Sequence, residues 1–186
     1  GGFIFAIDLE TGTETWRFNT LARQGEPGGN TWNNIPLEER QGGSVWNTGA
    51  YDAELDLVFY GVSPTYNTGP LLYSLSVGDV NNDALYTNTT LALRPATGEL
   101  VWHYQHVAND QFDLDWIFER SIVELEVDGE MRKVIVTAGK PALFDALDAA
   151  TGEYLFSVDP GIQNLFSAIN PVTGEKIPNP NVFPDP

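Results

Sequence analysis

A short pattern recurs along the chain and limits the folds that the chain can adopt. In each copy an apolar segment leads into a turn that contains Thr-Gly, and in three copies an aromatic residue follows the glycine by four positions. The copies begin at Ala6, Ala92, Ala146 and Ala168, and the last one is partial. A supersecondary unit that repeats in this way buries its apolar face against the neighbouring copies.

The residues of the turn predict a β-hairpin at each copy. Asp8, Asp148 and Asn170 end the apolar segments, and such side chains accept hydrogen bonds from the backbone of their own turn. Glycine adopts a positive φ angle at little cost, as tight hairpins require. We therefore expect repeated hairpins in radial packing, with the aromatic residue between neighbouring blades. An irregular β-sandwich does not explain why the aromatic residues stay in register.

Other segments agree with an all-β fold. Eighteen glycines and twelve prolines imply many turns, and residues 57–60 and 134–137 are short apolar runs typical of strands. Residues 23–43 form a long polar loop, and residues 112–123 hold at most a turn of helix. The sequence thus predicts a β-propeller in which residues 1–186 form a single partial domain of roughly three to four blades. Because the chain begins within a strand-like run and ends on loop residues, we expect it to be cut from a longer protein at both ends.

Charge and composition exclude several classes of function. The net charge of −17 disfavours nucleic acid and anionic membrane surfaces as partners. No apolar run reaches the length of about 20 residues that spans a bilayer. The chain has no cysteine, and therefore no disulfide, thiolate metal site or attachment motif for c-type haem. A small neutral substrate or a basic protein partner fits this composition better.

The densest group of reactive side chains lies in residues 109–116. This segment holds Asp110, Asp113 and Asp115 between aromatic residues. If it is extended, Asp113 and Asp115 point to the same side about 7 Å apart, where they could share a metal ion, or one could act as a base. A solvated acidic loop is the alternative interpretation, and the flanking Phe112 and Trp116 favour a partly buried site.

Two further residues are candidates for ligand binding. Trp46 lies among small residues that would leave its ring accessible for stacking on a planar molecule, although a core tryptophan in a glycine-rich turn explains the pattern equally well. Lys140 lies between two apolar segments and could neutralise an anionic oxygen, or it could be an ordinary turn lysine.

These residues together resemble a known family. The repeat Ala-x-Asp-x-x-Thr-Gly-x-x-x-Trp is similar to the tryptophan-docking repeat of the eight-bladed quinoprotein dehydrogenases, which use pyrroloquinoline quinone (PQQ). Residues 46–61, 100–105 and 110–113 resemble that family in order and spacing. The resemblance covers nearly the whole chain and implies a periplasmic or secreted PQQ-dependent alcohol dehydrogenase, with cytochrome c or another acceptor as its electron partner.

The resemblance also implies roles for individual residues. Trp46 would stack against PQQ, Asp113 would be the catalytic base that accepts the alcohol proton as hydride passes to the quinone, and Lys140 would contact the quinone oxygens. Asp113 would also ligate a metal ion, either Ca²⁺ or a lanthanide, and Asp115 resembles the extra carboxylate of lanthanide-using members. Pro64 stands where the family has an asparagine metal ligand, which Thr65 or Asn67 would have to replace.

Two alternative functions remain open. One is a non-catalytic propeller that acts as a scaffold for other proteins, as in outer-membrane assembly lipoproteins with the same repeat. The other is a sugar dehydrogenase, or a family member that has lost its metal through changes such as Pro64. The combination of Trp46, Asp113 and Lys140 favours the enzyme, because a scaffold has no use for it.

Overall fold

Strands and loops make up nearly all of the computed structural model, which describes residues 2–66 and 69–182. The strands are β1 (Phe3–Ile7), β2 (Glu14–Asn19), β3 (Ala50–Asp52), β4 (Leu57–Gly61), β5 (Thr89–Leu93), β6 (Leu100–Gln105), β7 (Ser121–Val127), β8 (Glu130–Ala138), β9 (Phe144–Asp148), β10 (Tyr154–Val158), β11 (Phe166–Ile169) and β12 (Lys176–Pro178). Single turns of 3-10 helix occur at Gly29–Thr31, Leu37–Glu39 and Gly69–Leu71. Residues 112–120 form no helix and lead as a loop into β7.

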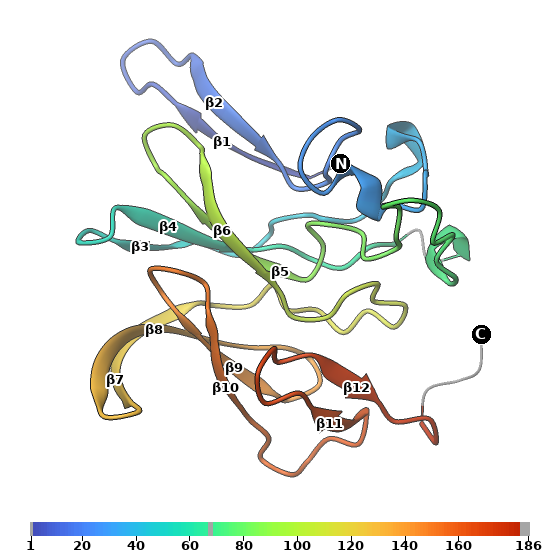
Figure 1. The fold of residues 1–186 in the computed structure, drawn as a ribbon. Helices are drawn as coiled ribbons and strands as arrows, with labels where there is room; N and C mark the ends of the chain where they lie inside the picture. The colour runs from blue at the N-terminus through green and yellow to red at the C-terminus, as the bar shows by residue number, and fades with distance from the viewer. Residues whose placement is uncertain (1, 67–68, 183–186) are drawn as a thin grey trace.

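The strands form four antiparallel sheets in chain order. Two sheets have four strands each, β3 to β6 and β7 to β10, and each of these follows the chain as a simple meander. The hairpins β1-β2 and β11-β12 form the other two sheets. Figure 1 shows β1-β2 at the top, the sheet of β3 to β6 below it, and the sheet of β7 to β10 beside β11-β12 in the lower part. The strands expected at residues 57–60 and 134–137 are confirmed as parts of β4 and β8.

Each copy of the repeat forms the expected hairpin. The turns join β1 to β2, β5 to β6, β9 to β10 and β11 to β12. In every turn the glycine N–H donates to the carbonyl four residues earlier, and the glycine φ angle is positive. The four donor–acceptor distances are 2.8 Å for Gly12 to Asp8, 2.8 Å for Gly98 to Arg94, 2.8 Å for Gly152 to Asp148 and 2.9 Å for Gly174 to Asn170.

The aromatic residues of the first two copies dock on the turn of the following copy. A methyl group on Gly98 would overlap the ring of Trp16, and one on Gly152 would overlap the ring of Trp102. Glycine is therefore needed there for the close approach of the indole as well as for the turn. The indole nitrogens donate to the carbonyl groups of Pro95 (2.9 Å from Trp16) and Ala149 (3.1 Å from Trp102).

The third copy differs from the expectation. Phe156 pairs with Ala146 in the register that Trp102 has with Ala92, but its side chain is 37% exposed. Tyr154 instead lies against Gly174, where an added methyl group would overlap its ring. The prediction that Phe156 packs between the repeats is therefore wrong, because the ring of Tyr154 occupies the docking position on the turn of the next copy.

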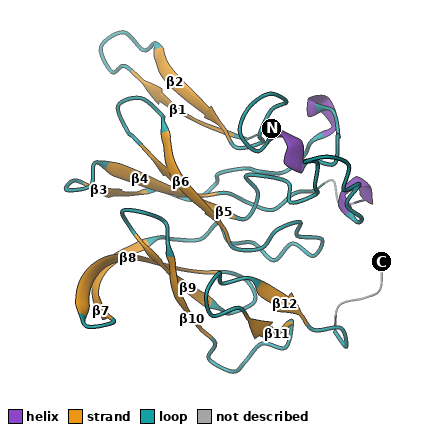
Figure 2. Cartoon of the chain, in the orientation of Figure 1, coloured by secondary structure: helices purple, strands orange, loops and turns teal. Residues whose placement is uncertain are grey.

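The core between the two large sheets positions the loops that precede their first strands. Phe59 and Trp102 of one sheet pack in the same cluster as Ile135 and Leu147 of the other. The first strands, β3 and β7, approach each other at one end of this interface. Loops and the short helices gather on one side of the strands (Figure 2), and the segments that enter β3 and β7 come from that side.

Candidate active site

Trp46 lies four residues before β3 and is not a core residue. Its side chain is 56% exposed, which excludes the interpretation as a buried tryptophan in a turn. Its ring meets that of Phe118 in an edge contact, with centroids 5.8 Å apart and planes at 81°. Phe118 belongs to the segment that enters β7, so this contact joins the two segments that lead into the first strands of neighbouring sheets.

Asp113, Asp115 and Lys140 meet in one ion cluster. The Lys140 Nζ atom lies 2.7 Å from Oδ2 of Asp113 and 2.7 Å from Oδ2 of Asp115. The side chains of Asp113 and Lys140 are 62% and 42% exposed, whereas that of Asp115 is 11% exposed. Lys140 is thus more than a turn lysine, because it bridges the two carboxylates that the sequence places side by side.

The backbone of the acidic segment is not extended, which corrects one expectation. Asp113 and Asp115 have φ angles of +59° and +37°, in the left-handed region that aspartate adopts more readily than most residues. Their carboxylates converge because the chain bends at both residues, and not because of the alternation of an extended strand. The N–H of Lys140 donates to the carbonyls of Leu114 (3.0 Å) and Asp115 (3.1 Å), so the two segments are also joined through their backbones.

The ion pairs affect the charge state of the lysine. Hydrogen bonds to Asp113 and then Asp115 raise the pKa of Lys140 above its ordinary value. Lys140 is therefore a permanent cation at neutral pH. The ion pair of Asp113 and Lys140 is well exposed, so solvent screens it and it contributes little to the stability of the fold. Its main effect is to hold the two charged groups next to each other.

Asp110 and Asn88 support this loop, and sequence reasoning assigned no role to either. The carboxylate of Asp110 is buried and accepts hydrogen bonds from the backbone N–H groups of Phe112 (2.8 Å) and Leu114 (2.7 Å) and from the Asn88 amide (2.7 Å). Burial raises the pKa of Asp110. An aspartate two residues before a backbone donor is a known turn signal, so the sequence contained the information for this role.

Arg120 is a second supporting residue that the sequence did not reveal. It donates to the carbonyls of Trp116 and Phe118 and to the hydroxyl of Thr90. Burial lowers the pKa of Arg120 to about 9, so it keeps its charge at neutral pH. A methyl group on Gly61 would overlap its guanidinium, which shows how closely β4 covers it. No motif distinguishes this arginine from a surface one.

The donor set fits part of a metal site and not a whole one. The carboxylates of Asp113 and Asp115 both contact the Lys140 ammonium group, so they lie close together. Carboxylate oxygens are hard ligands of the kind that Ca²⁺ and lanthanides prefer. Within residues 2–66 and 69–182, however, no group of three His, Cys, Asp or Glu side chains is arranged to hold a metal ion. Ca²⁺ takes six to eight oxygens, so Asp113 and Asp115 would supply only a share of the ligands.

The described residues around Pro64 use their polar groups in hydrogen bonds within the chain. Pro64 is buried, and its carbonyl accepts the N–H of Gly43 at 3.1 Å. The hydroxyl of Thr65 donates to the carbonyl of Gln41 at 3.1 Å. Asn67, the other substitute for the family asparagine, lies outside the described residues.

The exposed residues also fit a planar anionic quinone. PQQ is flat and carries carboxylates and quinone oxygens, so it needs an aromatic surface and a cation. The half-exposed indole of Trp46, before β3, and the ammonium group of Lys140, in the β8-β9 loop, offer these two contacts.

In the part of the chain that the structure describes, no helix is both long and apolar enough to cross a membrane.

Curated proteins of known activity resemble the chain over nearly its full length. The dehydrogenase subunit of the quinone-type alcohol dehydrogenase of Komagataeibacter europaeus is 35% identical over 197 residues, which cover 98% of this chain and 26% of that protein. The quinohemoprotein alcohol dehydrogenase ADH-IIG of Pseudomonas putida is 36% identical over 166 residues, which cover 83% of this chain and 22% of that protein. The chain thus spans about a quarter of the length of the curated relatives it matches.

Solved structures and a family model give the same assignment. The chain matches a quinohemoprotein alcohol dehydrogenase of Pseudomonas putida HK5 with a TM-score of 0.82 and 31% identity, over 96% of this chain and 27% of that one. A europium-containing methanol dehydrogenase matches with a TM-score of 0.81 at 24% identity, over 96% of this chain and 33% of that one, which shows the fold alone. The family model for the β-propeller domain of PQQ-dependent glucose, ethanol and alcohol dehydrogenases matches residues 1–176. These matches confirm the predicted propeller, and the chain belongs to the PQQ-dependent dehydrogenase family.

Proposed function

We propose that this chain is part of a PQQ-dependent dehydrogenase that oxidises an alcohol to an aldehyde, and that it carries the catalytic base. The observation that carries the proposal is the meeting of Asp113, Asp115 and Lys140, because the two aspartates belong to the segment that enters β7 and Phe118 of that segment contacts Trp46. The residues 1–186 would form one partial propeller domain of a longer protein.

Asp113 would accept the hydroxyl proton of the alcohol. Its carboxylate is exposed enough to reach a substrate, and the Lys140 ammonium group lies 2.7 Å from it. Asp113 shares Lys140 with Asp115, which is nearly buried and keeps the ammonium group in place when Asp113 turns toward a substrate. Lys140 would then orient Asp113 and bind an anionic oxygen of the cofactor at the same time.

Cofactor binding would use groups that this chain already exposes. Trp46 would stack on PQQ, Lys140 would bind its oxygens, and Asp113 and Asp115 would supply carboxylate ligands to Ca²⁺ or a lanthanide ion. When bound, PQQ supplies the group that accepts hydride from the alcohol carbon. The chain itself supplies the stacking surface, the cation and the base.

The surroundings of the enzyme follow from charge and from its relatives. We place the full protein in the periplasm and pair it with cytochrome c or another acceptor, because a chain with a net charge of −17 attracts a basic partner. The substrate is a small alcohol, in keeping with the alcohol dehydrogenase names of the relatives.

Reconstitution of the full-length protein tests this function. Protein loaded with PQQ and either Ca²⁺ or a light lanthanide is expected to oxidise short alcohols with a dye acceptor and to show the absorbance of bound PQQ. A protein that binds no PQQ and turns over no alcohol with any metal would be the scaffold, and the enzyme proposal would be wrong. PQQ binding with turnover of sugars alone would support a sugar dehydrogenase.

The substitution Asp113→Asn tests the base. It keeps the size of the side chain and removes its ability to accept a proton, so turnover is expected to fall by about 100-fold or more while PQQ absorbance persists. Asp128→Asn is the matched control, because Asp128 is also exposed and left-handed (φ +53°) but lies in the β7-β8 turn. Equal turnover in the two variants would exclude Asp113 as the base.

A further inference from the structure

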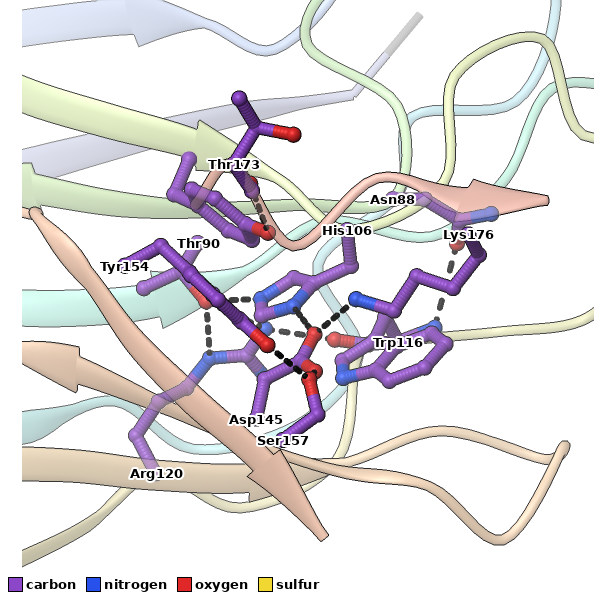
Figure 3. Close-up of polar contacts among 11 residues, drawn as sticks. Asn88, Thr90, His106, Trp116, Arg120, Asp145, Tyr154, Ser157, Thr173 and Lys176 are labelled. Carbon is purple, nitrogen blue, oxygen red and sulfur yellow. Dashed lines mark hydrogen bonds and ion pairs between the residues drawn. The ribbon is translucent and has the colours of Figure 1, made fainter. Parts of the chain in front are cut away.

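Three buried side chains from three different sheets form a second ion cluster, which the proposed chemistry does not use (Figure 3). Asp145 lies in β9, His106 directly follows β6, and Lys176 begins β12. Asp145 Oδ2 accepts a hydrogen bond from His106 Nδ1 at 2.6 Å and also contacts the Lys176 ammonium group. The side chains are 0%, 0% and 1% exposed in the order Asp145, His106, Lys176. We call these three residues the buried ion cluster.

The orientation of His106 in this cluster is fixed from both sides. Burial lowers the pKa of His106 to about 4, so the ring is neutral at pH 7. A carboxylate only accepts hydrogen bonds, so the ring proton lies on Nδ1, which faces Asp145. The other nitrogen, Nε2, accepts the hydroxyl of Thr90 at 2.8 Å, and the same hydroxyl oxygen accepts from Arg120 at 3.1 Å.

Trp116 packs directly on the buried ion cluster. Its ring is parallel to that of His106, with an angle of 2° between the planes and 5.1 Å between the centroids. The Lys176 ammonium group lies 4.7 Å from the Trp116 ring centroid, within the range of a cation–π interaction. The indole is fully buried, and a methyl group on Gly139 would overlap it. Figure 3 shows His106, Trp116 and Lys176 gathered around Asp145.

The position of Trp116 in the chain connects this packing to the candidate active site. Trp116 directly follows Asp115, and Gly139 directly precedes Lys140. The indole therefore lies between the two segments whose side chains form the exposed ion pairs. The backbone N–H of Trp116 donates to Asn88 Oδ1 at 3.1 Å, so the backbone of this segment is fixed next to the buried ring.

We infer that the buried ion cluster positions Asp113 and Lys140 for catalysis by holding Trp116 against Gly139. His106 and Lys176 are positioning residues, since their hydrogen bonds, ion pairs and ring contacts within the described residues do not include Asp113 or Asp115, and they act through the indole. The inference rests on the proposed function, because positioning matters to turnover only if Asp113 is the base. The physical coupling between the cluster and the Lys140 backbone can be measured independently.

The test uses two cluster variants and one control in the full-length, PQQ-loaded protein. Lys176→Met keeps the length of the side chain and removes its charge, and His106→Gln keeps a donor for Asp145 but removes the ring under Trp116. Arg40→Met is the control, because Arg40 is also a buried cation beside a tryptophan, but it binds carbonyls in the loop of residues 22–35. His106→Gln serves if Lys176→Met does not fold.

Two measurements are made, hydrogen exchange and steady-state kinetics. In the cluster variants, exchange at the amides of Trp116 and Lys140 is expected to rise about tenfold, while the β1-β2 hairpin is unchanged. The kcat is expected to fall about 10- to 100-fold at nearly constant KM, since a misplaced base slows the chemical step more than it weakens substrate binding. Arg40→Met should leave both quantities near those of the unmodified protein.

The outcomes separate the inference from the function on which it rests. Absence of PQQ-dependent turnover in the unmodified protein would overturn the proposed function, while a rise in exchange at Trp116 and Lys140 would still establish the coupling. Normal turnover in the unmodified protein, with exchange and kcat of the cluster variants equal to those of Arg40→Met, would overturn the inference alone.

Discussion

Single carboxylates near Lys140 have different surroundings and therefore different expected roles. Asp113 is largely exposed, Asp115 is nearly buried although it shares the same ammonium group, and Asp110 is fully committed to backbone and amide donors. Burial and hydrogen bonding thus give three aspartates within six residues different expected roles. Asp113 is the reactive group, Asp115 balances the charge of Lys140, and Asp110 supports the loop.

The role of Asp115 in metal choice can be tested by Asp115→Ala in the full-length protein. A trivalent ion gains more from one extra anionic oxygen than Ca²⁺ does, so we expect lanthanide-supported turnover to fall on the order of tenfold more than calcium-supported turnover. Turnover is measured with each metal after removal of bound ions. An equal loss with both metals would assign Asp115 to charge balance around Lys140 and not to the metal.

Acid is expected to weaken the fold through His106. Its pKa is lowered by burial to about 4, whereas the unfolded chain has a value near 6.5, so between these pH values the unfolded state binds the extra proton. The stability is complete above about pH 6.5 and falls as the pH drops toward 4, by about 3 kcal/mol in total.

The pH dependence of the free energy of unfolding measures this contribution. His106→Gln has no proton to gain, so its unfolding free energy should change less between pH 6.5 and 4 than that of the unmodified protein. Asp145, Lys176, Arg120 and Tyr104 surround the ring and are present in both proteins. Parallel curves for the two proteins would mean that His106 is already protonated in the native state.

At the scale of elements, the repeated hairpin does two things with one glycine. The positive φ angle closes the turn, and the missing side chain admits the aromatic ring of the preceding copy. Gly12 has the first property alone, because an added methyl group there would meet no atom within 4 Å. Gly98 has both.

Alanine substitutions at these two glycines separate the turn from the docking. Gly12→Ala is expected to cost about 1 kcal/mol, the penalty of a left-handed alanine. Gly98→Ala pays the same penalty and also displaces the Trp16 ring, which adds about 1 to 3 kcal/mol. Denaturant unfolding of the full-length variants gives the two values. A similar cost at both positions would mean that the Trp16 contact adapts without strain.

At the scale of the whole molecule, charge dominates what the surface can attract. The 26 acidic against 9 basic residues create a negative field that accelerates encounter with a basic protein. The residues of the candidate site lie in the loops that lead into β3 and β7 and that join β8 to β9.

Salt therefore provides a test of the partner. The rate at which the full-length protein reduces a basic cytochrome c is expected to fall several-fold between about 0.01 and 0.15 M ionic strength, because screening shortens the reach of the field from about 30 Å to 8 Å. An uncharged dye is the control acceptor, and its reduction should not depend on salt. A salt-independent rate with cytochrome c would exclude electrostatic docking to it.

The sequence by itself determined the hairpins and much of their order. Aspartate and asparagine before the turn and glycine within it act over four or five residues, so their effect is visible in the chain alone. The same local reasoning predicted strands β4 and β8 and named Trp46, Asp113, Asp115 and Lys140 as candidates. It was wrong about Phe156, since the choice between Tyr154 and Phe156 depends on which ring reaches the turn of the next copy, and that is a contact between separate hairpins.

Only the tertiary structure decided which of these residues meet. Lys140 reaches Asp113 and Asp115 because two left-handed residues bend the acidic segment toward the β8-β9 loop, which no local pattern predicts. The buried ion cluster was likewise invisible, because His106, Asp145 and Lys176 are far apart in the sequence and come from three sheets. Charged residues become buried only where packing of separate elements supplies their partners, so their roles follow from the fold and not from the chain around them.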